Sequence, residues 1–230
     1  MFPPTVSGCT HWMREPGTDN SINVVTKIGL TGSHYEVLRW RPEHSYQEPE
    51  TVATFTPKKS GYFHSFSITE NYVVLLIYPV TFDGSKAWSV NFHIFETMTH
   101  NPEGETDIYL INLKTGHVTR RTTGFVYSNH HGNAYETKDE IFVDISSAKW
   151  ASLRDYLKLK DMLNPPTVRN LTQPTGVDLL RLRIGLHADY VQVLLLSVTS
   201  SLYHYQETFM KPYCKHPLIL SNPRKSSMKS

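Results

Sequence analysis

The chain has 230 residues, a hydrophobic fraction of 39% and a net charge of +2 at pH 7. This length allows one domain or a large part of a bigger one. Charges of both signs are interspersed without a dense basic run, so nucleic acid is excluded as an expected partner. Two cysteines are too few for a disulfide scaffold, which favours a reducing compartment.

The N-terminal segment MFPPTVSG has neither the basic start nor the apolar stretch of a secretory signal, so we expect a cytoplasmic protein. The longest apolar segments, residues 72–80 and 191–198, are well short of the roughly 20 residues that span a bilayer. No amphipathic anchor helix is evident. Any association with a membrane is therefore expected to be peripheral.

Short segments rich in β-branched and aromatic residues follow one another to about residue 146, separated by Gly, Ser and Pro clusters. No helix-period pattern lies between them, so this region is predicted to be all-β. A nearly all-apolar strand at 72–78 is typical of an inner strand that is buried on both faces. A glycine turn at 114–117 predicts a hairpin. The predicted strands are 24–28, 35–40, 51–55, 72–78, 107–113, 118–121 and 140–145.

The pattern changes after residue 146. Leucines at mixed three- and four-residue spacings predict a short capping helix near 150–163, which ends at Asn164-Pro165-Pro166. Leucine and arginine alternate over 179–184, as expected of an edge strand. Residues 1–184 are therefore predicted to form the folded unit, and residues 185–230 a divergent tail whose last ten or so residues are disordered.

Three motifs centred on histidines occur at strand-to-loop junctions: His11 in CTHWMRE, His64 in GYFHSFSITENY and His130 in SNHHGNAYE. They are too far apart for a local metal-binding motif. Their separation suits successive blades of a β-propeller, which repeat at roughly 40–50 residues and are lengthened by insertions. Neutral imidazoles without thiolates favour an open redox or Lewis-acid site, with iron as the natural metal. A single histidine among twelve is nevertheless more often a satisfied polar residue than a ligand.

The segment YFHSFSITENYVVLLIYPV resembles the second-ligand segment of the carotenoid cleavage oxygenase family, with matches at His64, Thr69, Asn71 and Tyr72. The run His64-Ser65-Phe66 in this segment resembles animal members of the family more than plant members. DIYLINLKTGHV resembles the family's strand-turn-strand that ends in T-G.

HHGNAYE resembles the family's third-ligand motif, in which the ligand lies three residues before the asparagine, so His130 is chosen over His131. CTHWMREPGTDNSIN resembles the first-ligand segment around His11, although Trp12 occupies a position where proline is usual. The NAYE run resembles cleaving members of the family more than the isomerohydrolase. The resemblance covers residues 7 to about 184.

This resemblance implies a seven-bladed β-propeller with Fe²⁺ on its axis, held by four histidines and supported by outer glutamates. It implies that dioxygen cleaves one double bond of a carotenoid or apocarotenoid that enters through an apolar tunnel. Glu136 is then a candidate outer carboxylate for a ligand histidine, or a strand glutamate that bonds backbone amides. Phe63, Phe66 and Phe125 are candidate tunnel residues, with core packing as the alternative.

The family's fourth histidine lies in a P-x-x-F-H-G-like motif near its C-terminus, and nothing after residue 184 matches it. We therefore expect a partial propeller, which is a fragment or a truncated form. The first hypothesis for function is an Fe²⁺-dependent carotenoid cleavage dioxygenase, or a piece of one. The alternatives are a retinoid isomerohydrolase of the same family and a carotenoid or lipid binder without catalytic activity.

Overall fold

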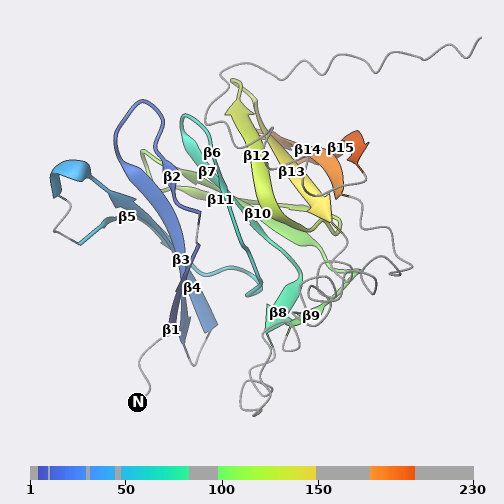
Figure 1. Cartoon of the computed structure of the whole chain (residues 1–230), viewed down its shortest axis with the longest axis horizontal. Helices are drawn as coiled ribbons and strands as arrows, with labels where there is room; N and C mark the ends of the chain where they lie inside the picture. The colour runs from blue at the N-terminus through green and yellow to red at the C-terminus, as the bar shows by residue number, and fades with distance from the viewer. Residues whose placement is uncertain are drawn as a thin grey trace, which may run out of the picture.

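The computed structural model of the chain describes residues 5–9, 11–29, 32–44, 48–82, 98–148 and 177–199. Within these ranges all regular structure is β-strand, apart from a short 3-10 helix at Pro42–His44. The strands form three large antiparallel sheets and one two-stranded sheet (Figure 1). The expected all-β class is thus confirmed. No helix within these ranges is long and apolar enough to cross a membrane.

The strand order shows three sheets that follow one another along the chain. The first sheet consists of β1 (Thr5–Gly8), β3 (Ser21–Gly29), β4 (Gly32–Trp40) and β5 (Glu50–Phe55), with β2 (Met13–Arg14) beside β3. The second consists of β11 (Val118–Thr123), β10 (Thr106–Asn112), β7 (Tyr72–Ile77) and β6 (Ser67–Ile68). The third consists of β12 (Ser128–Glu136), β13 (Glu140–Ala148), β14 (Val177–Gly185) and β15 (Val191–Thr199), while β8 (Val80–Phe82) pairs with β9 (Met98–His100).

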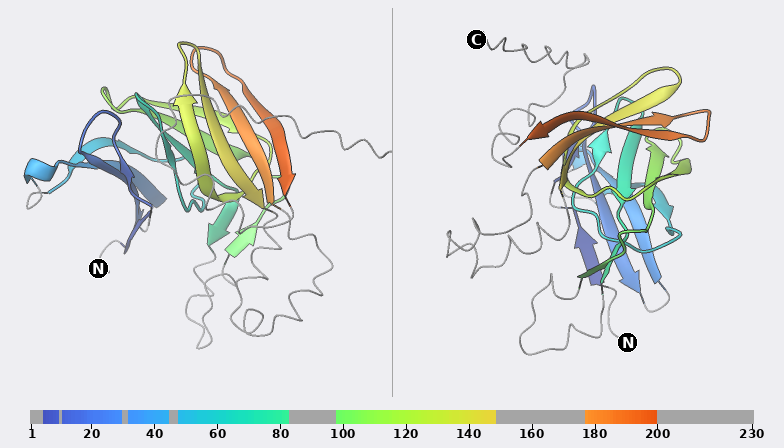
Figure 2. Two further views of the ribbon diagram at one scale, coloured as in Figure 1. Left: turned by 45° about the horizontal axis from the view of Figure 1, so that its top comes forward. Right: turned by 90° about the vertical axis from the view of Figure 1, so that its right-hand side faces the viewer.

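Each of the seven predicted strands overlaps a strand of the structure. The second sheet lies between the first and the third, and the three sheets are arranged like neighbouring blades of a propeller (Figure 2). The predicted helix at 150–163 and the last ten residues lie outside the described residues.

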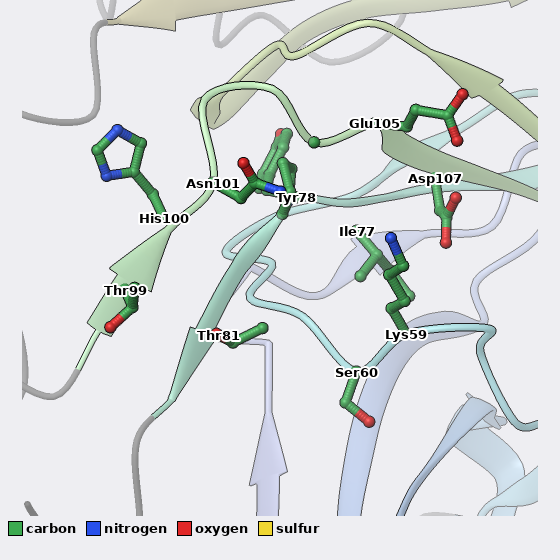
Figure 3. Close-up of a pocket in the computed structure, with 12 residues that line it drawn as sticks. Lys59, Ser60, Ile77, Tyr78, Thr81, Thr99, His100, Asn101, Glu105 and Asp107 are labelled. Carbon is green, nitrogen blue, oxygen red and sulfur yellow. The ribbon is translucent and has the colours of Figure 1, made fainter.

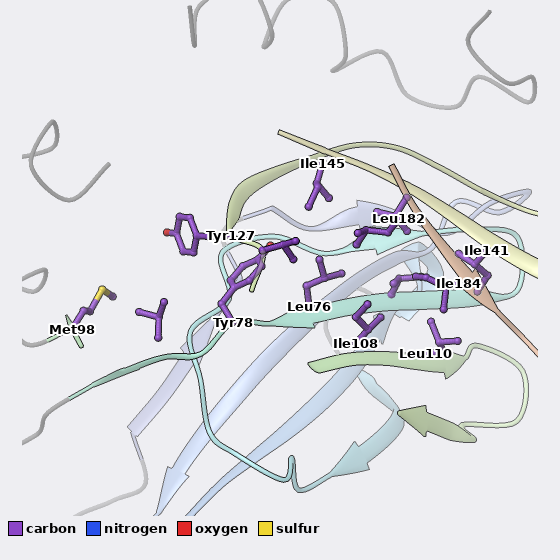
Figure 4. Packing of buried hydrophobic residues seen from close by; sticks show 14 residues of the cluster. Leu76, Tyr78, Met98, Ile108, Leu110, Tyr127, Ile141, Ile145, Leu182 and Ile184 are labelled. Atoms are coloured by element: carbon purple, nitrogen blue, oxygen red, sulfur yellow. The ribbon is translucent and has the colours of Figure 1, made fainter. Parts of the chain in front are cut away.

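Strand β7 accounts for the way the three sheets pack. Val73 and Leu75 belong to the cluster between the first and second sheets, whereas Val74 and Leu76 belong to the cluster between the second and third. Successive side chains of a strand point to opposite faces, so a strand with sheets on both sides needs apolar residues at every position. Figure 4 shows the second of these clusters, in which Leu76 and Ile108 lie near Ile141 and Leu182 of the third sheet. The prediction of an inner strand at 72–78 is confirmed.

Residues 179–184 do not form the edge strand that the sequence indicated. They belong to β14, which lies between β13 and β15. The arginines that suggested an edge are instead paired on one face of the third sheet, Arg181 with Asp144 and Arg183 with Glu140. Strand β15 pairs with β14 from Val191 to Thr199, so the sheet extends beyond residue 184, where we expected the folded unit to stop.

The turn between β10 and β11 provides a stability prediction. Gly116 has φ of 71°, and a Cβ atom at this position would collide with the carbonyl oxygen of Val52. Replacing Gly116 by alanine is therefore expected to lower the free energy of unfolding by about 2 kcal/mol, measured by urea denaturation. Gly124 has open space around its Cα and no positive φ, so Gly124→Ala is the control, with an expected change within about 0.5 kcal/mol. Equal losses in the two variants would contradict the prediction.

Candidate metal centre

The structure brings the three motif histidines together from three different sheets. His11 lies between β1 and β2, His64 lies in the segment that leads into β6, and His130 lies in β12. Each offers one ring nitrogen, and these nitrogens all lie within 4.8 Å of one another. Each of the three side chains is partly buried. Residues far apart in the chain therefore meet at one point, as the spacing of the motifs predicted.

The distances suit a shared metal ion. The Nε2 atoms of His11 and His64 are 3.1 Å apart. Two imidazole nitrogens bound to one ion at about 2.1 Å are expected to lie about 3.0–3.4 Å from each other. The rings meet edge to face, with centroids 4.9 Å apart for His11 and His64 and 5.2 Å apart for His11 and His130.

The surroundings keep the imidazoles of His64 and His130 neutral. Burial, together with the nearby His11 and His130, lowers the pKa of His64 to about 4. Burial and His11 also lower the pKa of His130. An imidazole binds a metal through an unprotonated nitrogen, so a histidine that is already neutral at pH 7 loses no proton when it binds. The donor set therefore fits a divalent cation of the kind that imidazole favours.

Cys9 joins the first two ligand segments. Its Sγ donates a hydrogen bond to the backbone oxygen of His64 at 2.9 Å and accepts one from the backbone N–H of His11 at 3.4 Å. Burial raises the pKa of the thiol, so the thiol form that donates is maintained. Nothing in the sequence around Cys9 indicates this link to His64.

The His64 segment is also bonded to β12 at alternate residues. Ser65 Oγ donates to the backbone oxygen of Asn129 at 2.6 Å, and Ser67 Oγ lies 2.8 Å from Nδ1 of His131. Side chains at every second residue of an extended segment share one face, so both serines reach the same neighbouring strand. These bonds hold the segment that carries His64 beside the strand that carries His130.

His131 faces away from the cluster, although it follows His130 directly. Its Nδ1 lies next to Ser67, and its Nε2 lies 3.4 Å from the hydroxyl of Tyr78. Burial and the three clustered histidines lower its pKa to about 3. The register of β12 shifts on both sides of this residue, and such bulges re-aim side chains. His130 is thus the residue of the pair that joins His11 and His64.

Glu136 lies at the other end of β12, roughly 20 Å along the strand from His130. Its carboxylate accepts hydrogen bonds from Thr69 Oγ1 at 2.5 Å and from the backbone and side-chain amides of Asn71. The bonds that the structure gives to Glu136 therefore tie β12 to the turn between β6 and β7. They correspond to the alternative role for this residue, in which it supports the backbone. Thr69 and Asn71, which matched the family motif, are the partners that the sequence did not connect with Glu136.

The three candidate tunnel phenylalanines lie in two separate groups. Phe66 is 1% exposed and belongs to the cluster between the first and second sheets, and Phe63 packs against the same cluster. Phe125 packs against the other cluster, and its ring centroid is 6.1 Å from that of His100. They pack against different clusters, and Phe66 has the core position that was the alternative.

A pocket of about 160 Å³ opens between the end of the second sheet and the two-stranded sheet of β8 and β9 (Figure 3). Charged side chains of Lys59, Glu105 and Asp107 line it together with Ile77 and Pro79. Its volume is below the roughly 300 Å³ at which ligand pockets usually begin, so it does not suit a long polyene.

Comparison with known proteins gives the family. A sequence model described as retinal pigment epithelial membrane protein matches residues 2–203. The chain belongs to this family. The match ends beyond residue 184, in keeping with the extent of the third sheet.

Curated relatives of the family are named as carotenoid-cleaving enzymes. The chain is 31% identical over 133 residues to the rat β,β-carotene 15,15'-dioxygenase, a match that covers 51% of this chain and 24% of the relative. It is 24% identical over 173 residues to the mitochondrial carotenoid-cleaving dioxygenase of Macaca fascicularis, covering 68% of this chain and 31% of the relative. The chain therefore spans about a quarter to a third of the length of these proteins.

Solved structures of the family share the fold. The cobalt-substituted apocarotenoid oxygenase of Synechocystis superposes with a TM-score of 0.64 at 21% identity, covering 82% of this chain and 38% of the other. A chimera of that enzyme with a family member superposes with a TM-score of 0.62 at 21% identity, covering 83% of this chain. The three sheets are thus part of a β-propeller of this family, as the sequence resemblance implied.

Proposed function

We propose that this chain is the part of a carotenoid-cleaving oxygenase that supplies three histidine ligands of an Fe²⁺ ion: His11, His64 and His130. The observation that carries the proposal is the convergence of these imidazoles from three sheets. The names of the curated relatives support carotenoids as the substrate class. The reaction is proposed for the longer assembly to which these sheets would belong, because the chain spans only part of its relatives.

Three neutral nitrogen donors without a thiolate suit iron in an open site. When bound, iron would supply the activation of dioxygen that splits one double bond of the polyene into two carbonyl groups. The role of the chain is to hold its imidazoles at fixed positions. Cys9, Ser65 and Ser67 provide this support, since each bonds the backbone or a side chain of a neighbouring ligand segment. Because the ligands are neutral, the charge of the ion is not reduced.

The proposal is tested by loading the purified chain with Fe²⁺ without oxygen and measuring iron per chain, then adding a carotenoid and dioxygen. We expect the chain to retain iron, and any aldehyde formed with oxygen uptake to require that iron, since the full reaction is proposed for the longer assembly. Failure to retain iron would overturn the proposal. An isomerised alcohol formed from a retinyl ester without oxygen uptake would instead indicate the isomerohydrolase alternative. Carotenoid retention by the metal-free chain without cleavage would indicate a binding protein.

A further inference from the structure

Tyr62 is held in place beside the candidate metal centre. Its backbone N–H donates to Val80 at 2.7 Å, and its backbone oxygen accepts from Tyr78 at 3.1 Å. Its ring stacks near that of Tyr127, with centroids 6.4 Å apart. These contacts fix the position of the phenol with respect to the second sheet.

The two ring nitrogens of His64 have different neighbours. Nδ1 lies 3.1 Å from the hydroxyl of Tyr62, whereas Nε2 lies 3.1 Å from Nε2 of His11. The side of the ring that carries Nε2 thus faces the other candidate ligands, and the side that carries Nδ1 faces the phenol. A neutral imidazole has one protonated nitrogen and one lone pair, so its tautomer decides which side can accept a metal.

A metal can bind Nε2 of His64 when the proton is on Nδ1. Histidines that bind metals usually donate this second N–H to a carboxylate, a backbone carbonyl or water, and the partner fixes the orientation of the ring. The phenol oxygen of Tyr62 is at the right distance to accept it. An un-ionised phenol oxygen has lone pairs that can accept this hydrogen bond. The same tautomer lets Nε2 of His64 accept a hydrogen bond from His11 when no metal is bound.

We propose that Tyr62 is a positioning residue that accepts a hydrogen bond from Nδ1–H of His64 and so directs the Nε2 lone pair at the point shared with His11 and His130. The part of this inference that concerns a metal rests on the proposed function. The part that concerns the tautomer applies to the metal-free chain as well, and it can therefore be tested separately.

The first test measures the tautomer of His64 by ¹⁵N NMR of the full chain at pH 7, labelled at histidine and assigned with a His64→Gln variant. We expect the Nδ1–H form in the wild type and a shift toward the Nε2–H form in Tyr62→Phe. Tyr109→Phe is the matched control, because this hydroxyl contacts the backbone N–H of Lys58 rather than a histidine. A wild-type Nε2–H form, or a tautomer that is the same in Tyr62→Phe, would overturn the inference.

The second test measures Co²⁺ affinity by titration, together with the melting temperature of each variant. Loss of a partner of this kind typically weakens metal binding about 10- to 100-fold, so we expect at least a tenfold loss in Tyr62→Phe and none in Tyr109→Phe. Equal affinity in wild type and Tyr62→Phe would overturn the inference. If the wild-type chain binds no Co²⁺ but its His64 tautomer responds to Tyr62→Phe, the positioning role stands and the proposed function fails.

Discussion

Replacing His64 or His130 by alanine is expected to weaken Fe²⁺ or Co²⁺ binding by about 100-fold or more. Each replacement removes one of three nitrogen donors from the cluster. Losing a group that merely supports a ligand already costs about 10- to 100-fold, and losing the ligand itself should cost at least as much. The measurement is metal per chain after dialysis, together with affinity from calorimetry.

The control for this experiment is His117→Ala, because His117 is exposed in the turn between β10 and β11 and is outside the cluster. We expect this variant to bind metal as the wild type does. Undiminished metal in both His64→Ala and His130→Ala would contradict the assignment. Circular dichroism of each variant separates loss of binding from loss of folding.

Replacing Asp144 by alanine is expected to lower the free energy of unfolding by about 3–5 kcal/mol. The Asp144 side chain is 2% exposed and makes two hydrogen bonds to Arg181, at 2.7 and 2.8 Å. The variant leaves the Arg181 guanidinium, whose side chain is 15% exposed, without its carboxylate. The cost is large because the guanidinium that remains is mostly shielded from water and has lost its counter-ion. Urea denaturation followed by circular dichroism measures it.

Two variants serve as controls for the ion pair. Asp19→Ala removes the partner of Arg14 in a pair whose side chains are 75% and 63% exposed, and the expected loss is at most about 1 kcal/mol. Replacing both partners by apolar residues, Asp144→Leu with Arg181→Met, should recover most of the stability lost in Asp144→Ala. A loss in Asp144→Ala no larger than that in Asp19→Ala would contradict the prediction.

The secondary structure was predictable because it depends on neighbours along the chain. The uninterrupted apolar run at 72–78 indicates a strand covered on both faces, and β7 is such a strand. The alternation of leucine and arginine at 179–184 was misleading. The alternation indicates which face of β14 is polar, but it does not indicate whether that face is covered. The carboxylates that pair with those arginines come from β13, a strand distant in sequence.

The sequence by itself determined the strands, the family resemblance and the three histidines that occupy matching motifs. The tertiary structure decided that these histidines lie within 4.8 Å of one another and that the carboxylate of Glu136 bonds Thr69 and Asn71. It also decided that Tyr62 faces one nitrogen of His64 while Cys9 bonds its backbone. The physical reason is the separation along the chain over which each effect acts. Period and propensity act between neighbours in the chain, whereas the hydrogen bonds that orient an imidazole depend on how separate sheets pack together.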